Sequence, residues 1–195
     1  MQPAAAAILS LRRLHPALSH ADVESVEVES FHEAVALSCR APAETDAAQY
    51  SLPFVVAATL VHGRLTAAEI AGAGLRDAAV LRFCRTMSLV ETEEFNRPFP
   101  GERWARVRLT LHDGTVLDSG PHTTAGDPDT PLDAEALSGK FRLNAAMALG
   151  ADAARRVEDL VATPRSGREL GAFLDHVLTA GHANALPPLP RHGAG

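Results

Sequence analysis

Cysteine is scarce in this sequence of 195 residues, which contains only two. Cys39 and Cys84 lie far apart and neither belongs to a CxxC pair. Disulfide frameworks and four-cysteine zinc sites need more cysteines at closer spacing, so the sequence excludes both. We expect both residues to be buried thiols.

Long hydrophobic runs are also missing. The longest candidate, residues 52–61, is about half of the roughly 18–20 apolar residues that a membrane-crossing helix needs, so we expect no membrane partner. In residues 1–13 the apolar segment is followed, not preceded, by Arg12 and Arg13. This order is the reverse of a secretory signal, and we therefore expect a cytoplasmic protein.

Positive charge is in deficit, with 18 Lys and Arg residues against 24 Asp and Glu residues and a formal net charge of −6. This is the wrong sign for a protein that binds a phosphate backbone, so we expect no nucleic-acid partner. Hydrophobic residues make up 46% of the chain, which is typical of a folded globular protein. We expect one domain over residues 1–180 and a flexible tail over 181–195, where no periodicity remains.

Motifs of familiar catalytic and metal sites are absent as well. The nine histidines include no HExxH pair, and His15 and His20 are five residues apart, which does not place them on one helical face. Gly72 and Gly74 lack the third glycine, the preceding strand and the lysine of a phosphate-binding loop. No GxSxG sequence is present. We therefore expect no metal site.

Hydrophobic periodicity predicts helices in several segments. Residues 4–14 form the first, and residues 47–61 are apolar on nearly all sides, which predicts a buried helix ended by Gly63. Thr66 and Glu69 have capping-box spacing, which predicts the start of a short helix at Thr66. A second short helix should begin after Asp77. The last third is predicted to be helical, over 130–150, 151–162 and from 166 onward. Thr130 is the expected N-cap of the first of these, with a buried stripe of Leu137, Phe141 and Ala145.

Alternating patterns predict a small sheet. In residues 22–31, Val26 and Val28 alternate with Glu27 and Glu29, and with Glu24 these carboxylates should form a solvated acidic face. Residues 105–112 alternate in the same way, and the two-residue turn Asp113-Gly114 should lead to a return strand over 115–118. With a further strand over 86–91, the predicted class is α+β, with about four mostly antiparallel strands covered by helices.

Four stretches in the same order resemble the C-terminal domain of the MmgE/PrpD family. Residues 48–58, AQYSLPFVVAA, are similar to the family's AQFSLPYAVAAAL helix and are the most specific match. The other three stretches are residues 22–29, DVESVEVE; residues 106–114, RVRLTLHDG; and residues 126–141, GDPDTPLDAEALSGKF. Together the resemblance covers about residues 1–176.

The resemblance implies a role in carboxylate metabolism. Family members include 2-methylcitrate dehydratase of propionate catabolism, cis-aconitate decarboxylase and iminodisuccinate epimerase, and they abstract a proton next to a carboxylate. They need no metal or organic cofactor and tend to be homodimers. A larger helical domain supplies much of the acid/base chemistry, and the C-terminal domain is its lid. Since this chain resembles the lid alone, we expect the isolated chain to be inactive.

The same comparison marks candidate site residues. Gln2 occupies the position of a family histidine and Phe54 that of a frequent tyrosine, so no catalytic residue is assigned. Tyr50, Lys140 and Asp127 are the candidates for substrate binding. Three of these residues have a structural alternative. Phe54 is explained equally as a core residue, Lys140 as a solvated surface charge, and Asp127 as a turn residue.

Three hypotheses about function remain open from the sequence. In the first, the chain is the lid subunit of a split lyase or isomerase for small di- or tricarboxylates, with the helical domain on another polypeptide. In the second, it is a catalytically silent lid remnant that acts as a binding or oligomerisation module. In the third, the resemblance is accidental and the chain is a small-ligand binding module.

Overall fold

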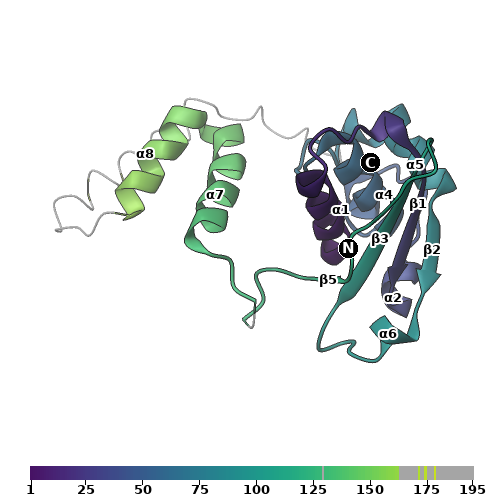
Figure 1. Cartoon of the computed structure of the whole chain (residues 1–195). Helices are drawn as coiled ribbons and strands as arrows, with labels where there is room; N and C mark the ends of the chain where they lie inside the picture. The colour runs from purple at the N-terminus through teal and green to yellow at the C-terminus, as the bar shows by residue number, and fades with distance from the viewer. Residues whose placement is uncertain (129, 163–170, 172–173, 175–177, 179–195) are drawn as a thin grey trace, which may run out of the picture. The chain divides into compact units, whose positions relative to one another are not determined.

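The computed structural model describes residues 1–128, 130–162, 171, 174 and 178, and it forms two compact units (Figure 1). The first unit extends from Met1 to Pro131, and the second begins at Leu132. Each is described by itself below.

The first unit combines a sheet with helices, and its elements follow one another in short succession. They are α1 (Gln2–Leu14), η1 (His20–Asp22), β1 (Val23–Ser30), α2 (His32–Ala36), α3 (Thr45–Gln49), α4 (Leu52–His62), η2 (Gly74–Arg76), α5 (Ala78–Thr86), β2 (Ser88–Glu91), α6 (Glu93–Asn96), β3 (Trp104–Leu111), β4 (Val116–Asp118) and β5 (His122–Thr123). The predicted α+β class is confirmed.

The sheet has the strand order β2-β1-β3-β4, with β5 paired to β3. β3 is antiparallel to β1, β4 and β5, whereas β1 and β2 are parallel. The sheet is therefore mixed rather than purely antiparallel. The parallel pair is accommodated because the chain between β1 and β2 passes through α2, α3, α4 and α5, which is the long crossover that parallel strands require.

Helices α1, α4 and α5 cover one face of the sheet (Figure 1). The alternating apolar residues of β1 and β3 point toward these helices, including Val26, Val28, Val107 and Leu109, all of which are buried. α4 is the central helix, with nine buried residues from Leu52 to Leu60. This core holds the ends of α1 and α4 in place at the candidate site.

The opposite face of the sheet carries paired charges. Arg106 Nη1 lies 3.0 Å from Glu29 Oε2, and Arg108 Nη1 lies 2.8 Å from Glu27 Oε1. Arg108 Nε also contacts Asp118 Oδ2 at 3.0 Å. The predicted acidic face is therefore neutralised in large part by arginines of the neighbouring strand.

The predicted helix over residues 47–61 is wrong in its continuity, because it is two helices, α3 and α4. The break lies at Tyr50 and Ser51, where the Ser51 hydroxyl accepts the Phe54 N–H at 3.1 Å and caps α4. Pro53 lies in the first turn of α4, where its missing N–H costs nothing. Gly63 ends α4 in the left-handed region with φ 69°, as predicted.

The capping-box spacing at Thr66 forms only one of the two hydrogen bonds of a capping box and starts no helix. Glu69 accepts the Thr66 N–H at 2.7 Å and the Arg64 Nε–H at 2.8 Å, within a turn. A side-chain carbon at Gly74 would lie 2.4 Å from the Glu69 carbonyl oxygen. Gly74 is therefore required by the close approach of two backbone segments. Asp77 caps α5 as predicted.

Two smaller expectations need correction. The turn after β3 is one residue longer than predicted, because the Leu111 N–H donates to the Thr115 carbonyl and only Gly114 has positive φ, at 84°. This matches a three-residue hairpin loop with a terminal glycine. Cys39 is exposed, whereas Cys84 is buried as expected. Burial raises the pKa of the Cys84 thiol to about 12.

The described part of the second unit contains α7 (Ala134–Leu149) and α8 (Ala151–Ala162). Asp133, not Thr130, caps α7, because its Oδ1 accepts the Ala136 N–H at 2.7 Å. Thr130 instead donates its hydroxyl to the Thr124 carbonyl. The predicted buried stripe on α7 is wrong, since Leu137 is 59% exposed and Phe141 36%.

Two other expectations about the end of the chain fall outside the described residues, apart from residues 171, 174 and 178. They are the helix predicted from residue 166 and the tail over 181–195. In the part of the chain that the structure describes, no helix has both the length and the apolar character needed to cross a bilayer.

Candidate functional site

Gln2 and Tyr50 lie together at one hollow of the first unit, although they are 48 positions apart in the sequence. We call this the N-terminal hollow; its volume is about 280 Å³. Its floor is apolar and consists of Phe31, Ala34, Leu37 and Phe99. The rings of Phe31 and Phe99 are stacked, with centroids 4.6 Å apart and an interplanar angle of 17°.

The rim of the hollow is polar and consists of Gln2, Glu33, Gln49, Tyr50 and Arg103. Gln2 is the first residue of α1. The break between α3 and α4 brings Tyr50 to the surface, where its side chain is 65% exposed. The break within the predicted helix therefore places the tyrosine at the hollow.

Arg103 is a rim residue that sequence reasoning missed. It directly precedes β3, and its exposed side chain lines the hollow together with Gln2 at the start of α1. The backbone on either side is held, because the Glu102 N–H donates to the Pro98 carbonyl at 2.9 Å and the Ser30 hydroxyl to the Trp104 carbonyl at 2.9 Å. No local pattern in the sequence marks this arginine, because its place at the hollow depends on segments that are far apart in the chain.

The electrostatics of the hollow favour an anion. Among the described residues, the Arg103 side chain forms no hydrogen bond or ion pair. Burial and the nearby Arg103 charge lower the pKa of the Met1 amino group. The N-terminal end of α1 has no side-chain cap, so its partial positive charge faces the same region. Glu33 is the acidic residue that opposes these positive groups.

Three other candidates lie elsewhere. Phe54 is fully buried in the core of the first unit, which is its structural alternative. Asp127 is exposed, and its carbonyl accepts the Thr130 N–H at 2.9 Å within a turn. Lys140 is exposed on α7 of the second unit. The structure thus brings Gln2 and Tyr50 to one hollow and leaves these three residues outside its lining.

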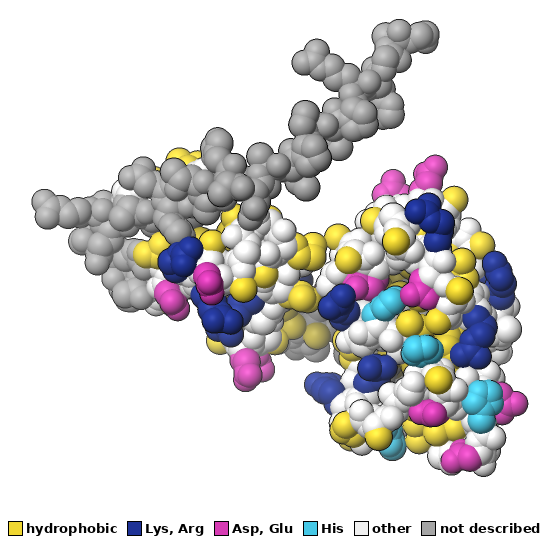
Figure 2. All heavy atoms as spheres, turned by 90° about the horizontal axis from the view of Figure 1, so that it is seen from above, with side chains coloured by type: hydrophobic (Ala, Val, Ile, Leu, Met, Phe, Trp, Pro, Cys, Tyr) yellow, Lys and Arg dark blue, Asp and Glu magenta, His cyan; other side chains and the backbone are white. Residues whose placement is uncertain are grey.

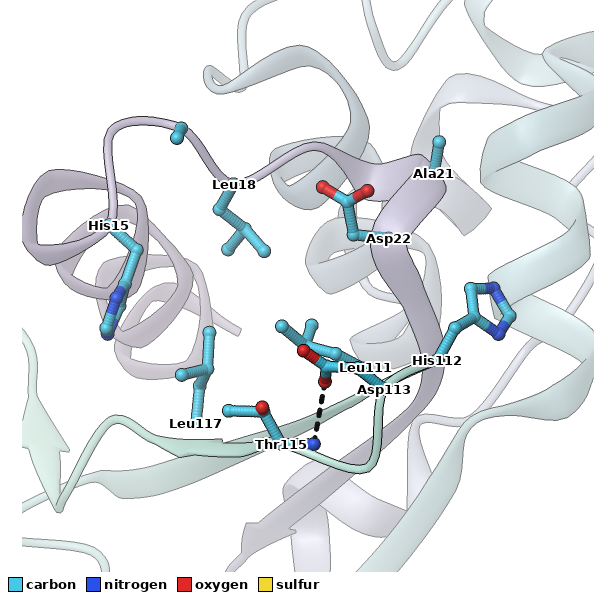
Figure 3. A pocket seen from close by; sticks show the side chains of 10 residues that line it. His15, Leu18, Ala21, Asp22, Leu111, His112, Asp113, Thr115 and Leu117 are labelled. Carbon is cyan, nitrogen blue, oxygen red and sulfur yellow. Dashed lines mark hydrogen bonds between the residues drawn. The ribbon is translucent and has the colours of Figure 1, made fainter.

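A second hollow, of about 560 Å³, lies at the hairpin end of the first unit (Figure 3). Leu18, Leu111 and Leu117 make its floor apolar. His15 and His112 lie on opposite sides, and His112 points away (Figure 3). Its two carboxylates serve the backbone, because Asp22 accepts the Ser19 N–H and Asp113 the Thr115 N–H. Both carboxylates of this hollow are therefore engaged with backbone N–H groups.

The histidines do not form a metal centre in the described part of the chain. Figure 2 shows imidazoles spread over the visible face of the first unit rather than gathered together. Among the described residues, no group of three His, Cys, Asp or Glu side chains is placed to hold a metal ion.

The first unit therefore has the features of an α+β domain with a surface hollow suited to an anion. Residues 1–164 match the MmgE/PrpD C-terminal domain, and the chain belongs to this family. A search of curated proteins found no match to the chain.

Proposed function

We propose that this chain is the lid of a lyase or isomerase that acts on small di- or tricarboxylates, in the manner of 2-methylcitrate dehydratase. The observation that carries the proposal is that two residues matched to the family's site, Gln2 and Tyr50, lie at one hollow with an unpaired arginine. The family match over residues 1–164 supports the same role. A helical domain on a partner polypeptide would supply the acid and base.

The chemistry of the rim supports binding rather than proton transfer. A glutamine amide donates and accepts hydrogen bonds but does not titrate near neutral pH, so Gln2 holds a substrate without taking its proton. The Tyr50 hydroxyl adds a further donor and acceptor. Proton abstraction next to a carboxylate therefore needs a base from the partner, and the isolated chain is inactive on this proposal.

Two further residues belong to the proposal as secondary substrate contacts. Lys140 is an exposed point charge that suits a second carboxylate, and Asp127 is exposed in the turn that precedes α7. Asp127 does not line the N-terminal hollow, and Lys140 belongs to the second unit, so on this proposal both act in an assembled enzyme. Cytoplasmic location and self-association are parts of the same proposal.

The test combines the purified chain with a candidate helical-domain protein from the same source. Size-exclusion chromatography with light scattering measures the complex, and dehydration of 2-methylcitrate measures activity. We expect a stable complex that is active while each protein alone is not, and Tyr50→Phe should raise KM of the complex. An active isolated chain, or a complex without activity on any di- or tricarboxylate offered, would overturn the proposal.

A second candidate function is a catalytically silent lid that serves as a binding or oligomerisation module. Gln2 in place of the family's histidine supports it, as do the exposed apolar residues of α7, which include Leu143 and Met147. Isolated chain that self-associates and ignores the helical-domain protein would favour this function over the first.

A further inference from the structure

We propose that Arg103 binds a carboxylate group in the N-terminal hollow and that this subsite is complete in the present chain. The identity of the carboxylate as a substrate rests on the proposed function. The binding itself does not, because it depends only on groups of the first unit.

The first argument is that the exposed Arg103 side chain has no hydrogen bond or ion pair among the described residues, whereas the partly buried arginines of this unit each have one. Arg12 donates to the Leu60 carbonyl at 2.8 Å near the C-terminal end of α4, and Arg40 donates to the Cys84 carbonyl at 2.8 Å near the end of α5. Arg106 and Arg108 pair with carboxylates of the sheet. Arg103 has no such partner among the described residues, although its backbone is held on both sides.

The second argument is the set of groups around Arg103. A guanidinium presents two parallel N–H donors that match the two oxygens of a carboxylate. The amides of Gln2 and Gln49 and the hydroxyl of Tyr50 supply further uncharged donors on the same rim. The stacked rings of Phe31 and Phe99 give the floor an apolar surface for the carbon skeleton of a small acid. A few polar groups around an apolar floor are typical of small-molecule sites.

The third argument concerns the charge and size of the ligand. Glu33 is on the same rim, so a compact ligand with high charge density, such as inorganic phosphate, meets repulsion as well as attraction. An organic acid can place one carboxylate at Arg103 and direct its other atoms along the apolar floor. The hollow of about 280 Å³ has room for an acid of a few carbons rather than a large cofactor.

The test is a titration of the full-length chain with citrate, followed by NMR of the side-chain amides and the arginine Nε–H groups. We expect saturable shifts at Gln2, Gln49 and Arg103. Arg103→Ala should weaken binding at least about tenfold, the effect of losing a hydrogen-bonded charge. Arg103→Lys should recover part of it, since lysine keeps the charge but not the fork.

Two controls make the result specific. Arg13→Ala removes an exposed arginine at the far end of α1 and should leave citrate affinity unchanged. Inorganic phosphate in place of citrate should bind more weakly, and tighter binding of phosphate would overturn the assignment to a carboxylate. Equal citrate binding by Arg103→Ala and the wild type, or no saturable shift at the rim, would overturn the subsite itself.

Failure of this inference is distinguishable from failure of the proposed function. Arg103-dependent citrate binding without activity in the reconstituted complex would support the subsite and reject the enzyme. An active complex whose KM is unaffected by Arg103→Ala would support the enzyme and reject the subsite.

Discussion

Glu69 shows how local hydrogen bonds decide the charge of a buried carboxyl group. Its side chain is only 4% exposed, and burial alone would raise its pKa. Hydrogen bonds from Thr66 and Arg64 outweigh that effect and lower the pKa to about 2. The group is therefore a carboxylate at neutral pH, held by its neighbours.

This shift predicts a pH-dependent stability contribution. Because the folded pKa lies below the ordinary value of 4.5, the contribution is present above about pH 4.5 and is lost as the pH falls toward 2. Glu69→Gln should lower the free energy of unfolding by about 1–3 kcal/mol at pH 7 and by roughly half as much at pH 3. Urea unfolding at the two pH values measures this, and a difference that does not change with pH would contradict it.

Gly74 leads to a second prediction at the level of one residue. Gly74→Ala would place a carbon 2.4 Å from the Glu69 carbonyl oxygen and 2.5 Å from that of Ala68. Since both atoms are backbone, we expect a loss of about 1–3 kcal/mol or more. Thermal unfolding by circular dichroism measures it. Gly139→Ala is the control, because a carbon there meets nothing within 4 Å inside α7 and should cost nothing.

At this scale the sequence indicated two residues that line the same hollow, and their role in binding stays a prediction. Gln2 and Tyr50 were found through resemblance, and the structure places them at one hollow. Arg103 was missed because its significance depends on how the start of β3 packs beside α1, which no local pattern encodes. Phe54 was open to two interpretations, and its complete burial supports the core alternative.

Between neighbouring elements, His32 and Glu91 connect the start of α2 to the end of β2. His32 Nδ1 lies 2.9 Å from Glu91 Oε2, and Asn96 donates to the other Glu91 oxygen at 2.8 Å. The hydrogen bond to Glu91 and its negative charge raise the pKa of His32. The pair therefore contributes to stability below the ordinary histidine pKa of 6.5, and the contribution is lost as the pH rises through the raised value.

We expect Glu91→Gln to lower the pKa of His32 toward its ordinary value. An NMR titration of the imidazole C–H signals measures the change. Glu24→Gln removes a carboxylate from β1 that is not among the groups acting on His32, so it should leave this pKa unaltered. An unchanged His32 pKa in Glu91→Gln would show that the contact does not persist in solution.

Strands were predicted more successfully than helix ends. Alternation identified β1 and β3 because one face of each strand is buried and the other is wet. The break between α3 and α4 was missed because residues 47–61 are apolar on nearly all sides. Such a segment has no hydrophobic periodicity whose interruption would mark the end of one helix. Pro53 was the usable signal, since proline in a first turn implies a cap just before it, at Ser51.

The second unit carries the apolar surface most relevant to assembly. None of the residues of α7 is buried, and Leu143 and Met147, one turn apart, are 47% and 57% exposed. Exposed apolar groups that lie together on one helix are typical of interaction surfaces. On the proposed function, this surface contacts a partner polypeptide or a second copy of the chain.

This surface predicts the effect of paired substitutions on association. Leu143→Glu together with Met147→Glu should weaken association at least about tenfold, because two charges would have to be buried. Light scattering measures the assembly, and circular dichroism checks that the fold is retained. Arg155→Glu and Arg156→Glu, also charge-changing substitutions at exposed positions of the second unit, form the control. Equal loss in both pairs would indicate a general charge effect instead of an apolar interface.

At the level of the whole chain, family and class could be predicted, whereas the single domain over residues 1–180 stays a prediction. That prediction came from length and composition, which do not register that no residue of α7 is buried. Apolar residues at helical spacing give the same sequence pattern whether they pack inside the chain or against a binding partner. The pattern alone therefore predicts burial within the chain.

The strand order has a consequence for synthesis of the protein. β1 is made before both of its neighbours in the sheet, β2 and β3, which come from residues at least 58 positions further along the chain. α1 packs on α4 and also on β3. On the ribosome, β1 must therefore wait for its complete set of neighbouring strands until Leu111 has emerged, and nascent chains stalled before Trp104 should be sensitive to protease and dependent on chaperones.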